Sequence, residues 1–200
     1  MNKKEEISGL RIRVESCQRC GLHKTRKNTV IGAGSLDAGI MFIGEAPGFN
    51  EDMKGEPFVG RAGTIFDELL KSIDLGRYDV YIANILKCRP PSNRNPQAEE
   101  IRACTPYLDE QISIIRPRII ATLGGFSMSY IFGKFRLKED KISRIHGRVF
   151  SISNLSGIRN IVPLYHPAVA TYNPGMKGVL MSDFATLRKL SEQYDKPESA

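Results

Sequence analysis

Residues 39–52 read GIMFIGEAPGFNED, an apolar run that passes directly into a turn rich in glycine, proline and acidic side chains. Such a run, bounded by turn residues, is typical of a strand buried on both faces of a parallel sheet. The turn carries Glu45, Glu51 and Asp52, although the chain has a formal net charge of +7. The stretch therefore predicts a buried strand, and it raises the question why a basic protein keeps acids where that strand ends.

Strand and helix patterns alternate along the rest of the chain. Further strands are expected at 79–86, 116–124, 147–152 and 159–165. Helices are expected at about 3–16, after Gly63, after Pro96, at 125–132 and at 177–194. Alternation of this kind predicts an α/β fold, a three-layer α/β/α sandwich with a mainly parallel central sheet.

The helix after Pro96 has two local signals. Asn95 and Pro96 are suited to the N-cap and the first turn of a helix. Pro106, farther along, predicts a kink or an early break, because proline removes a backbone hydrogen bond inside a helix.

The length of 200 residues fits one domain, expected to span residues 1–194 and to be followed by a polar tail at 195–200. No apolar stretch approaches the ~20 residues of a membrane span, and the first residues lack the apolar core of a secretory leader. We expect a cytoplasmic monomer that does not bind membranes. The excess of Lys and Arg, 29 against 22 Asp and Glu, favours a polyanionic partner such as nucleic acid.

Four cysteines need a role. Cys17 and Cys20 form a CxxC pair, whereas Cys88 and Cys104 are separated by 15 residues. In a protein without secretory features this pattern favours a metal over disulfides. The spacing alone leaves both tetrahedral zinc and an iron–sulfur cluster open.

Ligands of parallel α/β sheets bind beyond the carboxyl ends of the strands. This rule places the turn at 44–52, Asn84 and the segment after Tyr165 on one rim of the predicted sheet. The turn itself lacks the lysine and the Ser or Thr of a nucleotide-binding P-loop.

Three rim segments, GEAPGFNEDMKGEPFVGRAG at 44–63, YIANILKCRPPSNRNP at 81–96 and LYHPA at 164–168, closely resemble the family-four uracil-DNA glycosylases. The resemblance extends from about Ser16 to Leu190. It implies removal of uracil from DNA, with free uracil and an abasic site as products and no strand cleavage. It also implies one 4Fe-4S cluster with a structural role, held by Cys17, Cys20, Cys88 and Cys104.

The resemblance assigns uracil recognition to particular side chains. Asn84 matches the residue that reads the N3–H and O4 of a flipped base, a pattern that cytosine reverses. Phe58 matches the aromatic residue that stacks on the base, and His166 the donor that stabilises negative charge at O2 of the departing uracil. His23 and His146 are expected to be structural.

One position departs from the better-known branch of the superfamily, which has an aspartate where this chain has Ala46. The remaining acids are Glu45 and Glu51, the candidates for assisting the sugar cation. We expect main-chain contacts from Glu45 and Ala46 to uracil, and Glu51 as a wall that excludes the 5-methyl group of thymine.

DNA contacts are expected on both sides of the pocket. They comprise Arg61, main-chain N–H groups around Gly60 to Gly63, and the stretch at 169–178, which contains the basic Lys177. In that stretch either Tyr172 or Met176 supplies an apolar plug, or Pro174 shapes the loop that unstacks the base. Two other interpretations remain at this stage: a non-catalytic, metal-stapled domain that binds nucleic acid, and an electron carrier that uses the cluster.

Overall fold

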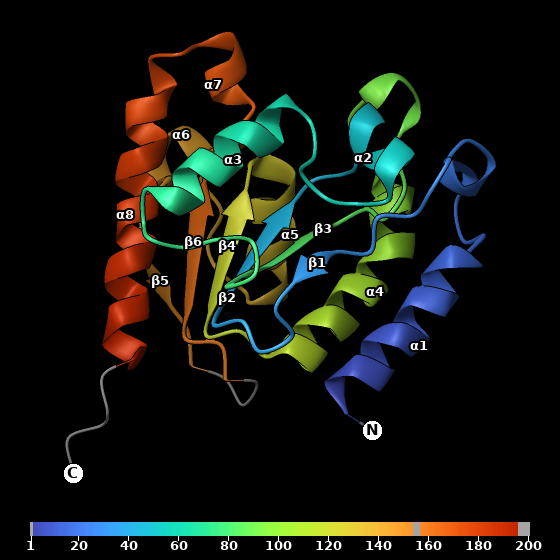
Figure 1. The fold of residues 1–200 in the computed structure, drawn as a ribbon, viewed down its shortest axis with the longest axis horizontal. Coiled ribbons are helices and arrows are strands. Elements are labelled where there is room, and N and C mark those ends of the chain that lie inside the picture. The colour runs from blue at the N-terminus through green and yellow to red at the C-terminus, as the bar shows by residue number, and fades with distance from the viewer. Residues whose placement is uncertain (1, 154–156, 196–200) are drawn as a thin grey trace.

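Six strands form one mixed sheet at the centre of the computed structural model, which describes residues 2–153 and 157–195 (Figure 1). The spatial order is β1-β3-β2-β4-β6-β5. The four inner strands are parallel, and each edge strand is antiparallel to its neighbour. The strands are β1 (Ala33–Gly34), β2 (Ile40–Gly44), β3 (Tyr81–Asn84), β4 (Ile119–Leu123), β5 (Phe150–Ser151) and β6 (Asn160–Leu164).

Helices cover both faces of the sheet. On one face lie α4 (Ala98–Ile115) and α5 (Gly125–Lys134), with α1 (Lys3–Glu15) packed against α4. On the other face lie α3 (Arg61–Lys71) and α8 (Met176–Asp195). The short elements are α2 (Phe49–Lys54), α6 (Ile142–Ile145), α7 (Val169–Tyr172) and the 3-10 turns η1 (Gly21–Lys24) and η2 (Pro91–Asn93).

The side chains of β2 show why this strand has apolar residues throughout. Met41 and Ile43 belong to the core under α1, α4 and α5, whereas Ile40 and Phe42 belong to the core under α3 and α8. Because successive side chains of a strand point to opposite faces, a strand between two helical layers needs apolar residues at every position. The predicted α/β/α sandwich with a mainly parallel sheet is confirmed.

The parallel register brings the predicted rim together. Gly44, the last residue of β2, lies directly beside Asn84, the last residue of β3. The segment after β6 begins with Tyr165 and His166 at the same end of the sheet. The turn after β2, Asn84 and His166 therefore share one edge, as the sequence predicts.

The predicted start of α4 is wrong, and so is an early break at Pro106. The helix begins at Ala98 with Gln97 as its N-cap, so Asn95 and Pro96 precede it. The Glu100 carboxylate accepts the Gln97 N–H at 2.8 Å and fixes this start. Pro106 does not end the helix, which continues to Ile115; this proline is on the exposed side, where water can bind the carbonyl that it leaves unpaired.

The stretch GEAPGFNED is not wholly a turn, because its second half opens helix α2. Glu51 and Asp52 lie in the first helical turn, where the helix dipole favours negative charge. Asp52 is buried, and its carboxylate accepts the N–H groups of Lys27 and Asn28 at 2.9 and 3.2 Å. Glu51 and Asp52 are thus placed by the start of helix α2 and, for Asp52, by main-chain donors from residues 27 and 28, which explains their presence in a basic chain.

The C-terminal helix α8 reaches Asp195, the first residue of the predicted polar tail, and residues 196–200 lie outside the described part of the chain. Among the described helices, none combines the length and the apolar character that crossing a membrane requires.

Candidate active site

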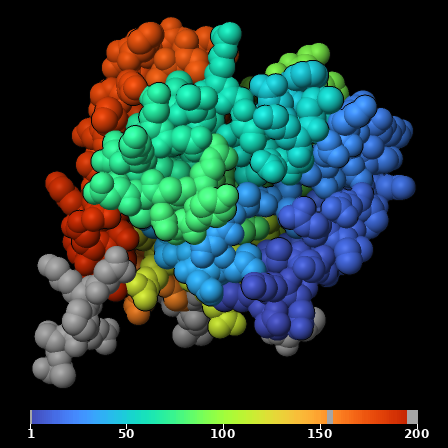
Figure 2. All heavy atoms as spheres, in the orientation of Figure 1, coloured from blue at the N-terminus to red at the C-terminus, as the bar shows by residue number. Residues whose placement is uncertain are grey.

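A cavity of about 360 Å³ opens at the carboxyl end of the sheet. This volume lies within the range of small-molecule sites. Its walls come from the turn after β2, from Phe58 and Ala62, from the end of β3, from the segment 90–94 and from the segment after β6. In Figure 1, α7, the start of α3 and α2 lie along this end of the molecule, and Figure 2 shows a notch between the surfaces of α3 and α2. The cavity brings together Glu45, Ala46, Glu51, Phe58, Asn84 and His166.

Asn84 lines this cavity with an amide that has no internal partner. The residue is 3% exposed, and within residues 2–153 and 157–195 its side chain makes no hydrogen bond. Buried amides are normally paired, so an open one at a cavity wall indicates a ligand. Gly44 makes room for it, because a Cβ at that position would lie 2.3 Å from Asn84 Oδ1.

His166 is held as one neutral tautomer. The Ala168 N–H donates to His166 Nδ1 at 3.1 Å, so Nδ1 must be unprotonated and Nε2 carries the hydrogen. Burial lowers the pKa of His166 to about 4, against the opposing charge of Glu51. At neutral pH the side chain therefore presents an uncharged N–H donor to the cavity.

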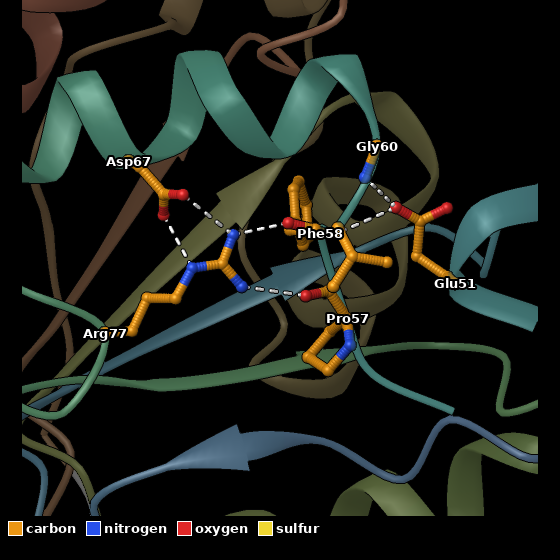
Figure 3. A network of polar contacts seen from close by, with 7 residues as sticks. Glu51, Pro57, Phe58, Gly60, Asp67 and Arg77 are labelled. Atoms are coloured by element: carbon orange, nitrogen blue, oxygen red, sulfur yellow. Dashed lines mark hydrogen bonds and ion pairs between the residues drawn. The ribbon is translucent and has the colours of Figure 1, made fainter. Parts of the chain in front are cut away.

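Phe58 is held in a strained backbone conformation, with φ of 54°. Arg77 donates from Nη1 to the Pro57 carbonyl at 2.9 Å and from Nη2 to the Phe58 carbonyl, and its Nε pairs with Asp67 at 2.6 Å (Figure 3). The Phe58 ring lies nearly parallel to that of His166, with 5.5 Å between the ring centres. Strain of this kind persists only where surrounding contacts enforce it, and it is frequent at functional sites.

The Glu51 carboxylate ties two walls of the cavity together. It accepts the Gly48 N–H at 3.1 Å. It also accepts the N–H groups of Val59 and Gly60 at 2.9 Å each (Figure 3). These bonds join the turn after β2 to the start of α3. Glu51 thus has the position expected of a cavity wall, and its oxygens are occupied by main-chain donors.

Glu45 and Ala46 line the cavity at the start of the turn after β2. The Glu45 carbonyl accepts the Leu86 N–H at 3.0 Å, while in the described chain neither main-chain group of Ala46 has a hydrogen bond. Burial raises the pKa of the Glu45 carboxyl above its ordinary value. Ala46 is consequently free for main-chain contacts, and Glu45 is the acid whose carboxylate has no internal partner among the described residues.

The expected DNA contacts at the start of α3 need correction. Gly63 is buried, and its N–H donates to the Gly60 carbonyl at 2.8 Å, so this amide is not available to a phosphate. Glycine is required there because a Cβ would lie 1.8 Å from the Phe58 carbonyl oxygen. The Gly60 N–H is likewise taken by Glu51. Arg61, the first residue of α3, is exposed and remains a candidate contact.

Tyr172 is the last residue of helix α7, and this residue is 89% exposed. Lys177 pairs with Glu68 at 2.6 Å and so joins α8 to α3. Tyr172 has the exposure that an apolar plug needs. Lys177 is already engaged in an ion pair with an acid on the neighbouring helix.

All four cysteines line a second, smaller cavity between η1, the loop after β3 and helix α4: Cys17, Cys20, Cys88 and Cys104. Burial raises the pKa of Cys20 and of Cys88, and it raises that of Cys104 to about 12. Thiols with such pKa values become thiolates at neutral pH only when a cation compensates their charge.

Hydrogen bonds converge on three of the sulfur atoms. Cys17 Sγ accepts the Arg19 N–H at 3.5 Å, Cys88 Sγ accepts Arg26 Nη1 at 3.3 Å, and Cys104 Sγ accepts the Lys87 N–H at 3.2 Å. In the described ranges, no three His, Cys, Asp or Glu side chains are arranged to hold one metal ion. The donor set fits a group with negatively charged sulfur ligands that are spread around a cavity.

Sequence reasoning missed Arg77, Asp67 and Lys87. Arg77 contacts a segment 19 and 20 residues away, and no local pattern signals this contact. Lys87 is 1% exposed, and its Nζ donates to the Asn84 carbonyl at 2.8 Å and to Gln111 Oε1. A fully buried lysine cannot be recognised from a sequence position beside a cysteine. His146, expected to be structural, pairs through Nδ1 with Asp183 at 2.8 Å.

Comparison with known proteins agrees with this geometry. The family model of the Uracil DNA glycosylase superfamily matches residues 31–188. A type-4 uracil-DNA glycosylase from Saccharolobus solfataricus is 51% identical, covering 90% of this chain and 82% of the relative. One from Archaeoglobus fulgidus is 45% identical over 93% of this chain and 94% of the relative. A type-5 enzyme from Thermus thermophilus is 29% identical over 68% of each chain. The chain therefore belongs to the uracil-DNA glycosylase superfamily, and within it to the type-4 uracil-DNA glycosylases.

Proposed function

We propose that this protein is a DNA repair enzyme that hydrolyses the N-glycosidic bond of deoxyuridine in DNA. The observation that carries the proposal is the unpaired, buried amide of Asn84 in a cavity that also contains the Nε2–H of His166. The relatives that share 51% and 45% identity are named for this activity. The products are free uracil and an abasic site, without strand cleavage.

Entry of the base requires the uridine to leave the helix. A base inside a duplex cannot reach a cavity of this kind, so the nucleotide is flipped into it. Uracil then stacks on Phe58. The side chain of Asn84 accepts a hydrogen bond from N3–H through Oδ1 and donates one to O4 through Nδ2. Cytosine presents the opposite donor and acceptor pattern, and a mismatch that leaves buried polar atoms unpaired costs about 1–3 kcal/mol per group.

His166 supplies the electrostatic part of the reaction. When the bond between C1′ and N1 breaks, the electron pair leaves with uracil, and negative charge develops at N1 and O2. A neutral Nε2–H directed at O2 stabilises this anion without having to give up its proton. Water adds to C1′ and releases a proton to solvent, and uracil regains a proton at N1.

Glu45 is the acid that we assign to the sugar cation, because its carboxylate has no internal hydrogen bond in the described chain, whereas that of Glu51 accepts three. Glu51 instead positions the wall beside C5 of the base. The main chain of Ala46 is available to uracil or to the attacking water. On the DNA, Arg61 contacts phosphate, and Tyr172 or Met176 replaces the extruded base.

A 4Fe-4S cluster held by Cys17, Cys20, Cys88 and Cys104 is part of the proposal. The shared cavity and the N–H groups directed at three sulfurs support it, since such donors are typical around iron–sulfur ligands. A bound cluster would supply structural stability by joining the N-terminal segment to the loop after β3 and to α4. Action as a cytoplasmic monomer stays a prediction from the sequence.

Uracil release from a labelled oligonucleotide with one uracil tests the function. We expect the wild type to release the base and leave an alkali-labile site, and Asn84→Ala to lose most of this activity. Asn84→Asp should gain activity on cytosine relative to uracil. A pure nucleic-acid-binding domain would bind the oligonucleotide and release nothing, and an electron carrier would tolerate Asn84→Ala.

A further inference from the structure

An exposed aromatic residue and an arginine meet at the rim of the cavity. Phe49 is the first residue of α2, directly after the cavity-lining Gly48, and it is 56% exposed. The guanidinium carbon of Arg89 lies 5.1 Å from the centre of the Phe49 ring. Arg89 precedes Pro90, which also lines the cavity. The pair thus connects two walls of the site at its mouth.

Arg89 is held in place from two sides. Its Nε donates to Asn93 Oδ1 at 2.7 Å, and Asn93 is itself a wall residue. Ser92 and Asn93 have φ values of 53° and 54°, in the left-handed region that non-glycine residues rarely adopt. In the described part of the chain the terminal nitrogens of Arg89 make no hydrogen bond. They remain available to an anion outside the protein.

We propose that Phe49 and Arg89 form a subsite for a nucleotide next to the uridine in the same strand. The neighbouring base stacks on the exposed part of the Phe49 ring, and its phosphate pairs with the terminal nitrogens of Arg89. The inference rests on the proposed function. It differs from the predicted contacts at Arg61 and Tyr172, which belong to helices α3 and α7.

Two features favour nucleic acid over a solvated surface. The ring is more than half exposed beside a cavity that accepts a base, and the adjoining cation is fixed rather than mobile. Tyr78 is another exposed aromatic residue, at 90%, but it lies before β3 at the opposite end of the strand from Asn84. Because the subsite contacts only the strand that carries the uridine, it should act on single-stranded and double-stranded substrates alike.

Base-deleted substrates test the stacking. Single-stranded oligonucleotides carry one uracil and either normal neighbours or a tetrahydrofuran abasic analogue at the 5′ or the 3′ neighbour. We expect Phe49→Ala to lower kcat/KM about 5- to 30-fold on the normal substrate. The loss should fall below about twofold on one abasic-neighbour substrate, because no base remains to stack. Phe49→Leu, which keeps apolar bulk without a ring, should behave like Phe49→Ala, and Tyr78→Ala like the wild type.

Equal losses on all substrates, or no loss, would overturn the stacking contact. Arg89→Ala should reduce the slope of log affinity against log salt by about one, and an unchanged slope would overturn the phosphate contact. Uracil release by the wild type separates this test from that of the proposed function. If no uracil is released, binding of the same oligonucleotides by the same variants still decides whether the subsite exists.

Discussion

The cavity at the strand ends and the cysteine cavity are neighbours, but they differ in whether the side-chain polar atoms of Asn84 and of Cys88 have hydrogen-bond partners within the protein. Asn84 and Cys88 are four residues apart, yet the side-chain amide of Asn84 has no hydrogen-bond partner among the described residues, whereas the sulfur of Cys88 accepts a hydrogen bond from Arg26. Open polar groups suit a ligand that enters and leaves in each cycle. Groups surrounded by donors suit an occupant that stays. The difference separates a site for exchange from a site for stability.

Lys87 joins the two regions. Its Nζ donates to the Asn84 carbonyl at 2.8 Å, and its own N–H donates to Cys104 Sγ at 3.2 Å. Burial lowers the pKa of Lys87 to about 8, against the charges of Cys104 and Cys88. Asn84 is therefore positioned from the side of the cysteine cavity.

Removing a cysteine should have the largest effect on stability, because it breaks the cysteine region. For Cys104→Ala we expect loss of bound iron and a fall of at least about 4 kcal/mol in the free energy of unfolding, because metal binding and folding are coupled. Iron analysis and denaturant titration measure both quantities. Ser113→Ala, an exposed position on the same helix, is the control and should change neither. A Cys104→Ala protein as stable as the wild type would contradict the structural assignment.

Removing His166 should break the exchange site alone. His166→Ala should lower kcat by about 10²- to 10³-fold, the loss expected for one preorganised donor to a developing anion. Single-turnover kinetics give the rate, and binding to uncleaved DNA should change by less than about threefold. Comparable losses in binding and rate would argue that His166 only shapes the cavity.

Releasing the strained Phe58 segment should have a smaller effect. Arg77→Met keeps an apolar stem but loses the bonds to the carbonyls of Pro57 and Phe58. We expect KM to rise about 10-fold, with a smaller change in kcat, since the stacking surface is no longer preorganised. Arg144→Met, which removes an exposed arginine paired with Asp140, serves as the control. A change confined to kcat would show that the segment acts on the chemical step instead.

The pH profile should show the smallest effect. Because the pKa of His166 is lowered to about 4, the imidazole is neutral from about pH 5.5 to 8, and the single-turnover rate should not fall as pH rises through 6.5. Below this range protonation of His166, and of Glu45 with its raised pKa, should reduce the rate. A single-turnover rate that falls as the pH increases from 6 to 7 would show that the imidazolium is the active form.

The inner strands and the rim were predictable because each depends on local pattern. The apolar run before Gly44 needs two helical layers, and strand ends of a parallel sheet share an edge, so Asn84 and His166 could be placed together. The prediction that the Gly63 N–H contacts DNA was wrong for a physical reason. A glycine at a helix start signals free amides, whereas here it admits the Phe58 carbonyl.

Long-range polar contacts account for what the sequence could not reveal. Arg77 and Lys87 act on carbonyl groups, which every residue possesses, so no particular side chain in the sequence identifies their partners. The start of α4 at Ala98 likewise depends on Glu100, which Arg94 holds through a bidentate pair. The short helix α2 was hidden because its six residues are too few to show a periodic pattern.

The two edge strands limit pairing between the sheet and a second copy of the chain. β1 and β5 contain two residues each, and Gly34 of β1 lies so close to β3 that a Cβ would be 1.9 Å from the Val80 carbonyl oxygen. Each edge therefore offers very little backbone to which a second chain could add a strand. Among the described residues the sheet therefore has no long free edge at which aggregation could begin, although its four central strands are apolar.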